Sequence, residues 1–181
     1  MAAPATTPAA GTPAQAVGRG PNGNFQGLAA GAVGSNEFLY AADFANGQIQ
    51  VWDSSWNQVT WPDAFHVRHL PDGFAPFNAQ VLTDPSGTQH VFVAYAKRNP
   101  ATGDEIAGKG LGLVAEFNTD GTFVRRFRGS DINPPSALAY APAGAGQAAG
   151  DPLGGPFGAG CLDIYATGIG PPDLTRPPAP P

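Results

Sequence analysis

The sequence has little charge and almost no sulfur. Only 13% of its 181 residues are charged, and it holds a single cysteine, Cys161. One cysteine excludes an intramolecular disulfide, and Cys161 has no Cys or His neighbour at the spacing of a metal site. The chain has nine Lys and Arg, a net charge of -5 and no basic run longer than Arg125-Arg126. We therefore expect no nucleic-acid partner, because phosphate binding requires a positive surface.

Long apolar runs are also lacking. No stretch has the length of a membrane-spanning helix, so we expect no membrane span. The first twenty residues, MAAPATTPAAGTPAQAVGRG, lack the basic start and apolar core of a secretory signal. The sequence by itself assigns no compartment.

Glycine and proline, in contrast, are abundant, with 25 and 20 residues. Much of this excess lies in residues 1–21 and 141–181, while aromatic and β-branched residues gather in the middle. Segments without large apolar side chains bury too little surface to offset the entropy lost on ordering. We predict a low-complexity disordered tail over 1–23, a β domain over 24–140, and a Gly/Pro-rich tail with a degenerate repeat over 141–181.

Alternating apolar residues predict short strands and no helices. The clearest signal is FLYAADFANGQIQVWD (38–53), in which two alternating runs flank the turn Asn46-Gly47. Phe38 and Val91 begin the same pattern about fifty residues apart, a spacing typical of propeller blades. The sequence thus predicts an all-β fold of four-stranded antiparallel units. Further strands are expected at 25–30, 58–61, 79–83, 90–96, 110–118, 122–127, 134–141 and 161–166, with 62–76 as a long connection.

Four segments carry a resemblance to a known family. They are FLYAADFANGQIQVWDSSW (38–56), LPDGFAPFNAQ (70–80), VFVAYAKRN (91–99) and GLGLVAEFNTDG (110–121). The chain resembles an uncharacterised bacterial family of predicted six-bladed β-propellers that is related to the NHL-repeat propellers and often exported. The resemblance covers about residues 24–140 and implies a partial β-propeller of two to three blades in an extracytoplasmic setting, without activity or site residues. The alternative is a β-sandwich-like domain made from the same strands.

Two loops hold candidate metal ligands. His66 and His69 lie three residues apart with Asp63 and Asp72 nearby, and such a cluster could bind a divalent cation. Asp104 and Glu105 offer oxygen ligands to calcium in a glycine-flanked loop. Because the first loop is bounded by prolines and the second does not fit an EF-hand, we favour solvated side chains in both. A divalent metal is the only cofactor that the sequence suggests.

Other patterns favour structural roles. No serine has a G-x-S-x-G context, and Gly108 to Gly112 lacks the Ser or Thr of a phosphate loop. For Asp43 and Asp53 we favour turn capping over a position at a channel mouth. An aromatic platform for carbohydrate is conceivable, although packing between sheets is the commoner role. The aromatic residues concerned are Trp52, Trp56, Trp61, Phe65, Phe74 and Phe77.

These observations favour a binding or scaffold module over an enzyme, because no catalytic motif is identifiable. Its ligand would be a protein, a glycan or a small molecule. One alternative is a metal-dependent hydrolase or lyase of propeller fold with ligands from the two loops, and a second is a truncated, non-functional remnant. Open sheet edges would favour self-association, because unpaired strand edges bind other chains.

Overall fold

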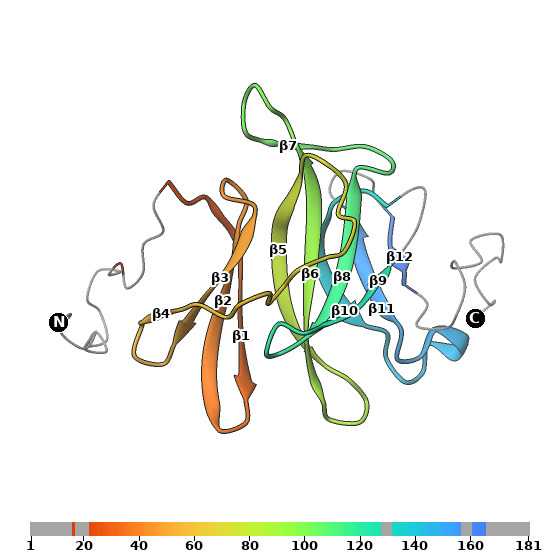
Figure 1. Cartoon of the computed structure of the whole chain (residues 1–181). Helices are drawn as coiled ribbons and strands as arrows, with labels where there is room; N and C mark the ends of the chain where they lie inside the picture. The colour runs from red at the N-terminus through yellow and green to blue at the C-terminus, as the bar shows by residue number, and fades with distance from the viewer. Residues whose placement is uncertain (1–15, 17–21, 128–131, 157–160, 166–181) are drawn as a thin grey trace, which may run out of the picture.

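The computed structural model describes residues 16, 22–127, 132–156 and 161–165. These residues form twelve β-strands, one short 3-10 helix and no α-helix. The strands make three antiparallel sheets that follow one another along the chain and stand in an open row (Figure 1). The expected all-β fold is confirmed. The tail expected over 1–23 and the chain after 165 lie almost wholly outside the described residues.

The first sheet, sheet A, is a meander of four strands. It contains β1 (Phe25–Val33), β2 (Asn36–Asp43), β3 (Gln48–Asp53) and β4 (Gln58–Val59), each paired with the strand before it. The turn between β2 and β3 is the expected one: Gly47 has a φ of 69° and its N–H donates to the Asp43 carbonyl at 2.9 Å. Glycine adopts this left-handed conformation at low cost.

The second sheet, sheet B, repeats this plan with an insertion. Its main path is β5 (Phe74–Thr83), β6 (Gln89–Arg98), β8 (Gly112–Asn118) and β9 (Phe123–Phe127), while β7 (Glu105–Ile106) pairs with β6. The connection predicted over 62–76 is shorter than expected, since β5 begins at Phe74. Pro76 is accommodated because the register shifts directly after it, and such irregularities tolerate a residue without an N–H donor.

The third sheet, sheet C, has three described strands. They are β10 (Pro135–Tyr140), β11 (Pro152–Pro156) and β12 (Asp163–Ile164), with the 3-10 helix η1 (Gly146–Ala148) between the first two. The strand expected over 161–166 is present as β12, which is the third strand of this sheet. The second strand, β11, was missed because its sequence, PLGGP, has no alternating pattern and a proline at each end.

The first strands of all three sheets share an irregularity at the same place. The register shifts at Gln26 in β1, at Phe77 in β5 and at Ser136 in β10. A bulge inserts one residue into a strand and changes its local twist. Its recurrence shows that the three sheets are structural repeats, which can be aligned residue by residue from the bulge.

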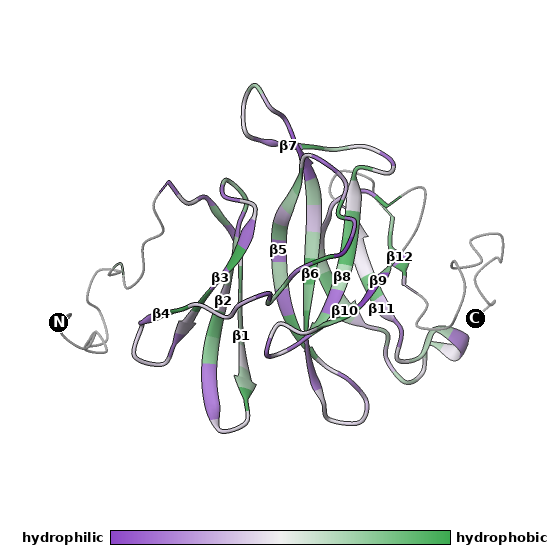
Figure 2. Cartoon of the chain, viewed as in Figure 1, coloured by the Kyte–Doolittle hydropathy of each residue, from purple (hydrophilic) through white to green (hydrophobic). Residues whose placement is uncertain are grey.

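Two apolar layers join the sheets. Sheets A and B enclose a core that includes Tyr40, Val51 and Tyr95, while sheets B and C enclose one that includes Phe92 and Leu138. Sheet B is therefore covered on both faces, so its strands need apolar residues at consecutive positions. Figure 2 shows this on β6, which is hydrophobic through most of its length and hydrophilic at its end.

Candidate functional site

The loop between β4 and β5 is anchored by alternate side chains. Phe65 and Val67 are buried in the core between sheets A and B, whereas His66 and Arg68 between and after them are exposed. The Phe65 ring lies 5.6 Å from the Tyr40 ring and 5.3 Å from the Phe117 ring, measured between centroids. The buried pair thus fixes a surface loop whose other side chains face solvent.

The turn between β8 and β9 forms the opposite wall. The Phe65 N–H donates to the Gly121 carbonyl at 2.8 Å, and the Tyr40 hydroxyl donates to the Thr119 carbonyl at 2.7 Å. Between the loop and the turn lies a pocket of about 640 Å³, which we call the loop pocket. Its lining consists of Pro62, Asp63, Ala64, His66, Arg68, Asp120, Gly121, Thr122 and Phe123.

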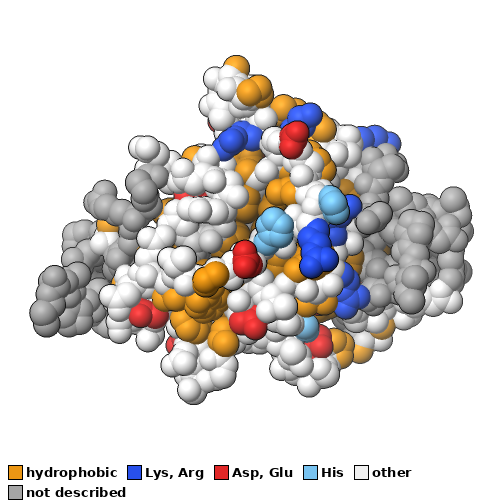
Figure 3. All heavy atoms as spheres, viewed as in Figure 1, with side chains coloured by type: hydrophobic (Ala, Val, Ile, Leu, Met, Phe, Trp, Pro, Cys, Tyr) orange, Lys and Arg blue, Asp and Glu red, His pale blue; other side chains and the backbone are white. Residues whose placement is uncertain are grey.

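The loop pocket brings together charges of both signs and an aromatic ring. Asp63 and Asp120 supply carboxylates, Arg68 a guanidinium, and Phe123 a partly exposed ring. Acidic, basic and histidine side chains gather on the face that this loop crosses (Figure 3). Asp120 is held by its own turn, because its Oδ1 accepts the Thr122 N–H at 2.8 Å.

Backbone strain is concentrated in the same loop. Asp63, Phe65 and His69 have φ values of 62°, 58° and 58°. Non-glycine residues adopt this left-handed conformation at a cost, and such residues occur frequently at ligand sites. Three of them within seven residues indicate that the loop is held in one particular shape by its buried anchors.

The structure separates the predicted metal ligands. His66 and Asp63 line the loop pocket, but His69 is not part of its lining, and the His69 carbonyl accepts a hydrogen bond from Arg126 at 3.0 Å. In the described part of the chain, no group of three or more His, Cys, Asp or Glu residues lies close enough together to hold a metal ion. Within the described ranges, His66 and His69 thus have no third His, Cys, Asp or Glu ligand grouped with them.

Asp104 and Glu105 lie elsewhere, in the hairpin that projects at β7 in Figure 1. Glu105 pairs with Arg98 across β7 and β6. The backbone of Asp104 is engaged in the turn, where its carbonyl accepts the Asn99 N–H at 2.7 Å. The two acidic residues thus sit on a hairpin that is stabilised by its own backbone hydrogen bonds.

The two strand-ending aspartates cap turns, as predicted. Asp43 is fully buried and accepts hydrogen bonds from Asn46, Gln50 and the Asn24 N–H. Burial alone would raise the pKa of Asp43, but these hydrogen bonds together lower it below the usual value. Asp53, at the end of β3, accepts hydrogen bonds from the Ser55 and Asn57 N–H groups.

Most of the aromatic residues singled out in the sequence pack between elements. Trp61, Phe65 and Phe74 join the core of sheets A and B, and Phe77 lies 5.8 Å from Phe44 between ring centroids. Trp56 is the exception, with 38% of its surface exposed. These positions favour packing over a shared platform for carbohydrate.

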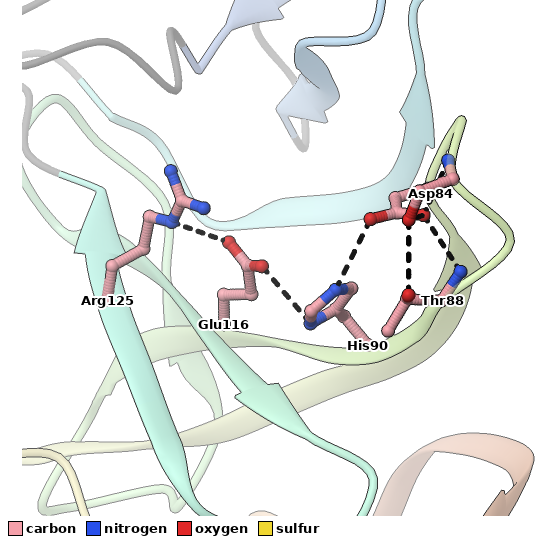
Figure 4. A network of polar contacts seen from close by, with 6 residues as sticks. Asp84, Thr88, His90, Glu116 and Arg125 are labelled. Atoms are coloured by element: carbon pink, nitrogen blue, oxygen red, sulfur yellow. Dashed lines mark hydrogen bonds and ion pairs between the residues drawn. The ribbon is translucent and has the colours of Figure 1, made fainter.

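A second polar cluster crosses sheet B on the face toward sheet C (Figure 4). The His90 side chain lies between two carboxylates, with Nδ1 3.3 Å from Glu116 Oε1 and Nε2 3.7 Å from Asp84 Oδ2. Arg125 Nε lies 2.8 Å from Glu116 Oε2. The distances are those of ion pairs, but neither His90 Nδ1 nor Glu116 Oε2 makes a well-oriented hydrogen bond.

Glu116 is the most deeply placed charge of this cluster, being only 3% exposed. Burial raises the pKa of Glu116, and the nearby Arg125 and His90 counteract that effect only in part. Ser86 Oγ bonds to Asp84 and lies next to Thr88, and no hydroxyl or thiol of the described residues is hydrogen-bonded to His90. In the described part of the chain, the cluster thus shows no nucleophile placed as in a hydrolase triad.

The sequence signal for this cluster is a single charged residue, Glu116, within the largely apolar strand β8, GLVAEFN. A buried carboxylate requires a partner, because an unpaired charge is costly to bury. The partners come from β6 and β9, and only the strand register brings them together.

Comparisons with known proteins found relatives in a virus. The chain is 32% identical over 146 residues to "Uncharacterized protein R648" of Acanthamoeba polyphaga mimivirus, covering 78% of this chain and 34% of that protein. It is 31% identical over 136 residues to "Uncharacterized protein L690" of the same virus, covering 72% of this chain and 35% of that protein. The chain thus spans about a third of the length of these relatives.

The bacterial assignment suggested by the sequence is wrong. The relatives are viral proteins, and they include "Uncharacterized protein R640" of the same virus, 29% identical over 134 residues. No protein family matches the chain, so no propeller family is shown. No solved structure matches it significantly. The extracytoplasmic setting was inferred from the bacterial resemblance and loses its support.

The described residues include no helix with the length and hydropathy required to cross a lipid bilayer.

Proposed function

We propose that this chain is a binding module, built from propeller-like sheets, which holds a small ligand in the loop pocket. The observation that carries the proposal is the pocket itself, about 640 Å³ in volume and bordered by Asp63, Asp120 and Arg68 beside the Phe123 ring. Protein pockets that bind small molecules have volumes of roughly 300–1,000 Å³ and contain a few polar groups that point toward the ligand. Buried side chains already hold the walls of the loop pocket in place. Ligand binding therefore costs less conformational entropy than it would at a flexible site.

The mixed lining favours a ligand that carries both charges next to an apolar group. Arg68 would pair with an anionic group and the two aspartates with a cationic one, while Phe123 would cover an apolar or ring face. The propeller-like arrangement is supported by the recurring bulge and by the order of strands in each sheet. In such a fold, loops between consecutive sheets are a usual place for binding sites.

Calorimetric titration with amino acids, amino sugars and neutral sugars tests the proposal. We expect zwitterionic ligands to bind, and Arg68→Gln or Asp120→Asn to weaken binding about tenfold or more, the effect of losing one charged hydrogen bond. Asn keeps the oxygen that caps the turn at position 120, so the wall should survive. Asp104→Asn, on the β7 hairpin, is the matched control. Equal binding by all of these variants would contradict the proposal.

A further inference from the structure

The last strand of sheet B, β9, has an open edge. It pairs with β8 and, among the described residues, with no other strand. The last described strands of sheets A and C, β4 and β12, have two residues each, whereas β9 has five. An edge strand presents backbone N–H and C=O groups that can pair with another chain. Of these three outer edges, that of β9 is thus the longest.

The hydrogen bonds of β8 show which backbone groups of β9 face outward. The Asn118 N–H of β8 donates to the Thr122 carbonyl at 2.9 Å. Because the direction of hydrogen bonds alternates along an antiparallel strand, the backbone groups of Glu116 also point toward β9, and those of Ala115 point away from it. Arg126 lies opposite Ala115. The N–H and carbonyl of Arg126 therefore point to the open edge.

The side chains along this edge are basic on both faces of the sheet. Arg125 projects toward Glu116 on the face of sheet C, and 41% of its side chain is exposed (Figure 4). Arg126 lies on the opposite face, where it donates a hydrogen bond to the His69 carbonyl at 3.0 Å. Val124 beside them is 37% exposed. In a chain with a net charge of -5, this open edge is a local positive surface.

We propose that the edge of β9 docks an extended acidic peptide of a partner protein, which adds to sheet B as a further strand. In this recognition mode, backbone hydrogen bonds supply affinity and alternate side chains supply specificity. The backbone groups of Arg126 would pair with the peptide backbone. Two consecutive acidic residues of the peptide would lie beside Arg126 on one face and Arg125 on the other, and an apolar residue next to them would cover Val124.

The charge of the edge selects this occupant over a second copy of the chain. Pairing of two β9 edges would bring arginines of both copies together, and like charges on neighbouring strands are destabilising. An acidic strand gains attraction at the same positions. The lining of the loop pocket ends at Phe123, whereas the docking edge begins at Val124, so the inference is independent of the proposed small ligand.

Fluorescence anisotropy of a labelled peptide with the full chain tests the proposal. The probe is an end-blocked hexapeptide in which two central glutamates are flanked by valine and threonine. We expect saturable binding that weakens with added salt, and no binding of the analogue with two lysines. N-methylation of both glutamates keeps their charges and removes their backbone donors, so it should weaken binding about tenfold or more.

A matched pair of variants locates the site. Arg126→Glu should weaken binding of the glutamate peptide about tenfold or more, because attraction is replaced by repulsion. Lys97→Glu, the same change of charge in β6, should leave it unaltered, and circular dichroism verifies that both variants are folded. Absence of binding to the parent chain at every concentration overturns the proposal. Equal binding of the N-methylated peptide, or an equal effect of the two variants, also overturns it, since either shows charge attraction without strand pairing at β9.

Discussion

The side-chain amide of Gln80 is paired with the backbone of Leu138 through two hydrogen bonds. Gln80 Nε2 donates to the Leu138 carbonyl at 2.8 Å, and the Leu138 N–H donates to Gln80 Oε1 at 2.6 Å. The Gln80 side chain in β5 thus provides hydrogen-bond partners for both the N–H and the carbonyl of Leu138 in β10. Buried peptide groups require such partners, so the pair specifies how the two sheets align.

We therefore expect Gln80→Ala to destabilise the protein by about 1–3 kcal/mol, the cost of leaving buried backbone groups unsatisfied. Urea unfolding followed by circular dichroism measures the free energy of unfolding. Gln48→Ala, at an exposed position of β3, is the control and should change it by less than about 0.5 kcal/mol. An equal effect of both substitutions would show that the amide pair contributes little.

Asp43 should make the protein sensitive to acid. Its pKa in the folded state is lowered, so its contribution to stability is present above the pKa of the unfolded chain and is lost as pH falls toward the folded value. Asp43→Asn should cost about 1–3 kcal/mol at neutral pH, because the new NH₂ group faces the donors that the carboxylate accepted. It should also flatten the loss of stability below about pH 4.

The matched control for Asp43 is Asp53→Asn. Asp53 caps its turn with similar hydrogen bonds, but these hydrogen bonds are exposed to solvent. Water can replace lost hydrogen bonds there, so we expect a smaller decrease in stability. Unfolding curves of the two variants at pH 7 and pH 3 make the comparison, and the prediction fails if Asp53→Asn is the more damaging change.

Glu116 should have the opposite pH dependence. Its pKa is raised by burial, so the folded chain retains a proton that the unfolded chain has released, and stability falls as pH rises from the unfolded pKa through the folded one. Glu116→Gln has no such proton to lose. Its stability relative to the parent chain should therefore increase between about pH 4 and pH 7.

Asp84 provides an internal contrast to Glu116, since both carboxylates flank His90. Hydrogen bonds from Ser86 and Thr88 lower the pKa of Asp84. The stability of Asp84→Asn relative to the parent should thus decrease as pH rises toward about pH 4, whereas that of Glu116→Gln increases above this pH. Parallel curves for the two variants would refute the assignment of opposite environments.

All four tyrosines of the chain should resist ionisation. Burial raises the pKa of Tyr40 and Tyr140 to about 12, and it raises those of Tyr95 and Tyr165 as well. The absorbance of phenolate at 295 nm should stay low at pH 10, where free tyrosine is half ionised. Because the folded chain keeps these protons, its stability should decrease above pH 10. Half-complete ionisation at pH 10 in a folded sample would contradict this.

Local patterns in the sequence were sufficient for most of the strands but not for the site. The hairpin at Phe38 to Asp53 could be predicted because alternation and Asn-Gly act within a few residues. β11 could not, since PLGGP has no side-chain pattern and forms a strand only by pairing with β10. His66 was identifiable alone, but its neighbour Asp120 comes from a turn far along the chain that only sheet stacking brings near.

The bulge shared by β1, β5 and β10 also has a consequence for how such a chain can change in length. Insertion of one residue into β1, β5 or β10 would move the side chains on one side of the insertion to the opposite face of the sheet. Duplication of a whole sheet would preserve that alternation, so genes for this architecture can grow by complete repeats. Between β6 and β8 the constraint is relaxed, since the β7 hairpin is accommodated there without a shift in the β6–β8 register. That hairpin is the natural place to graft a tag or a foreign peptide.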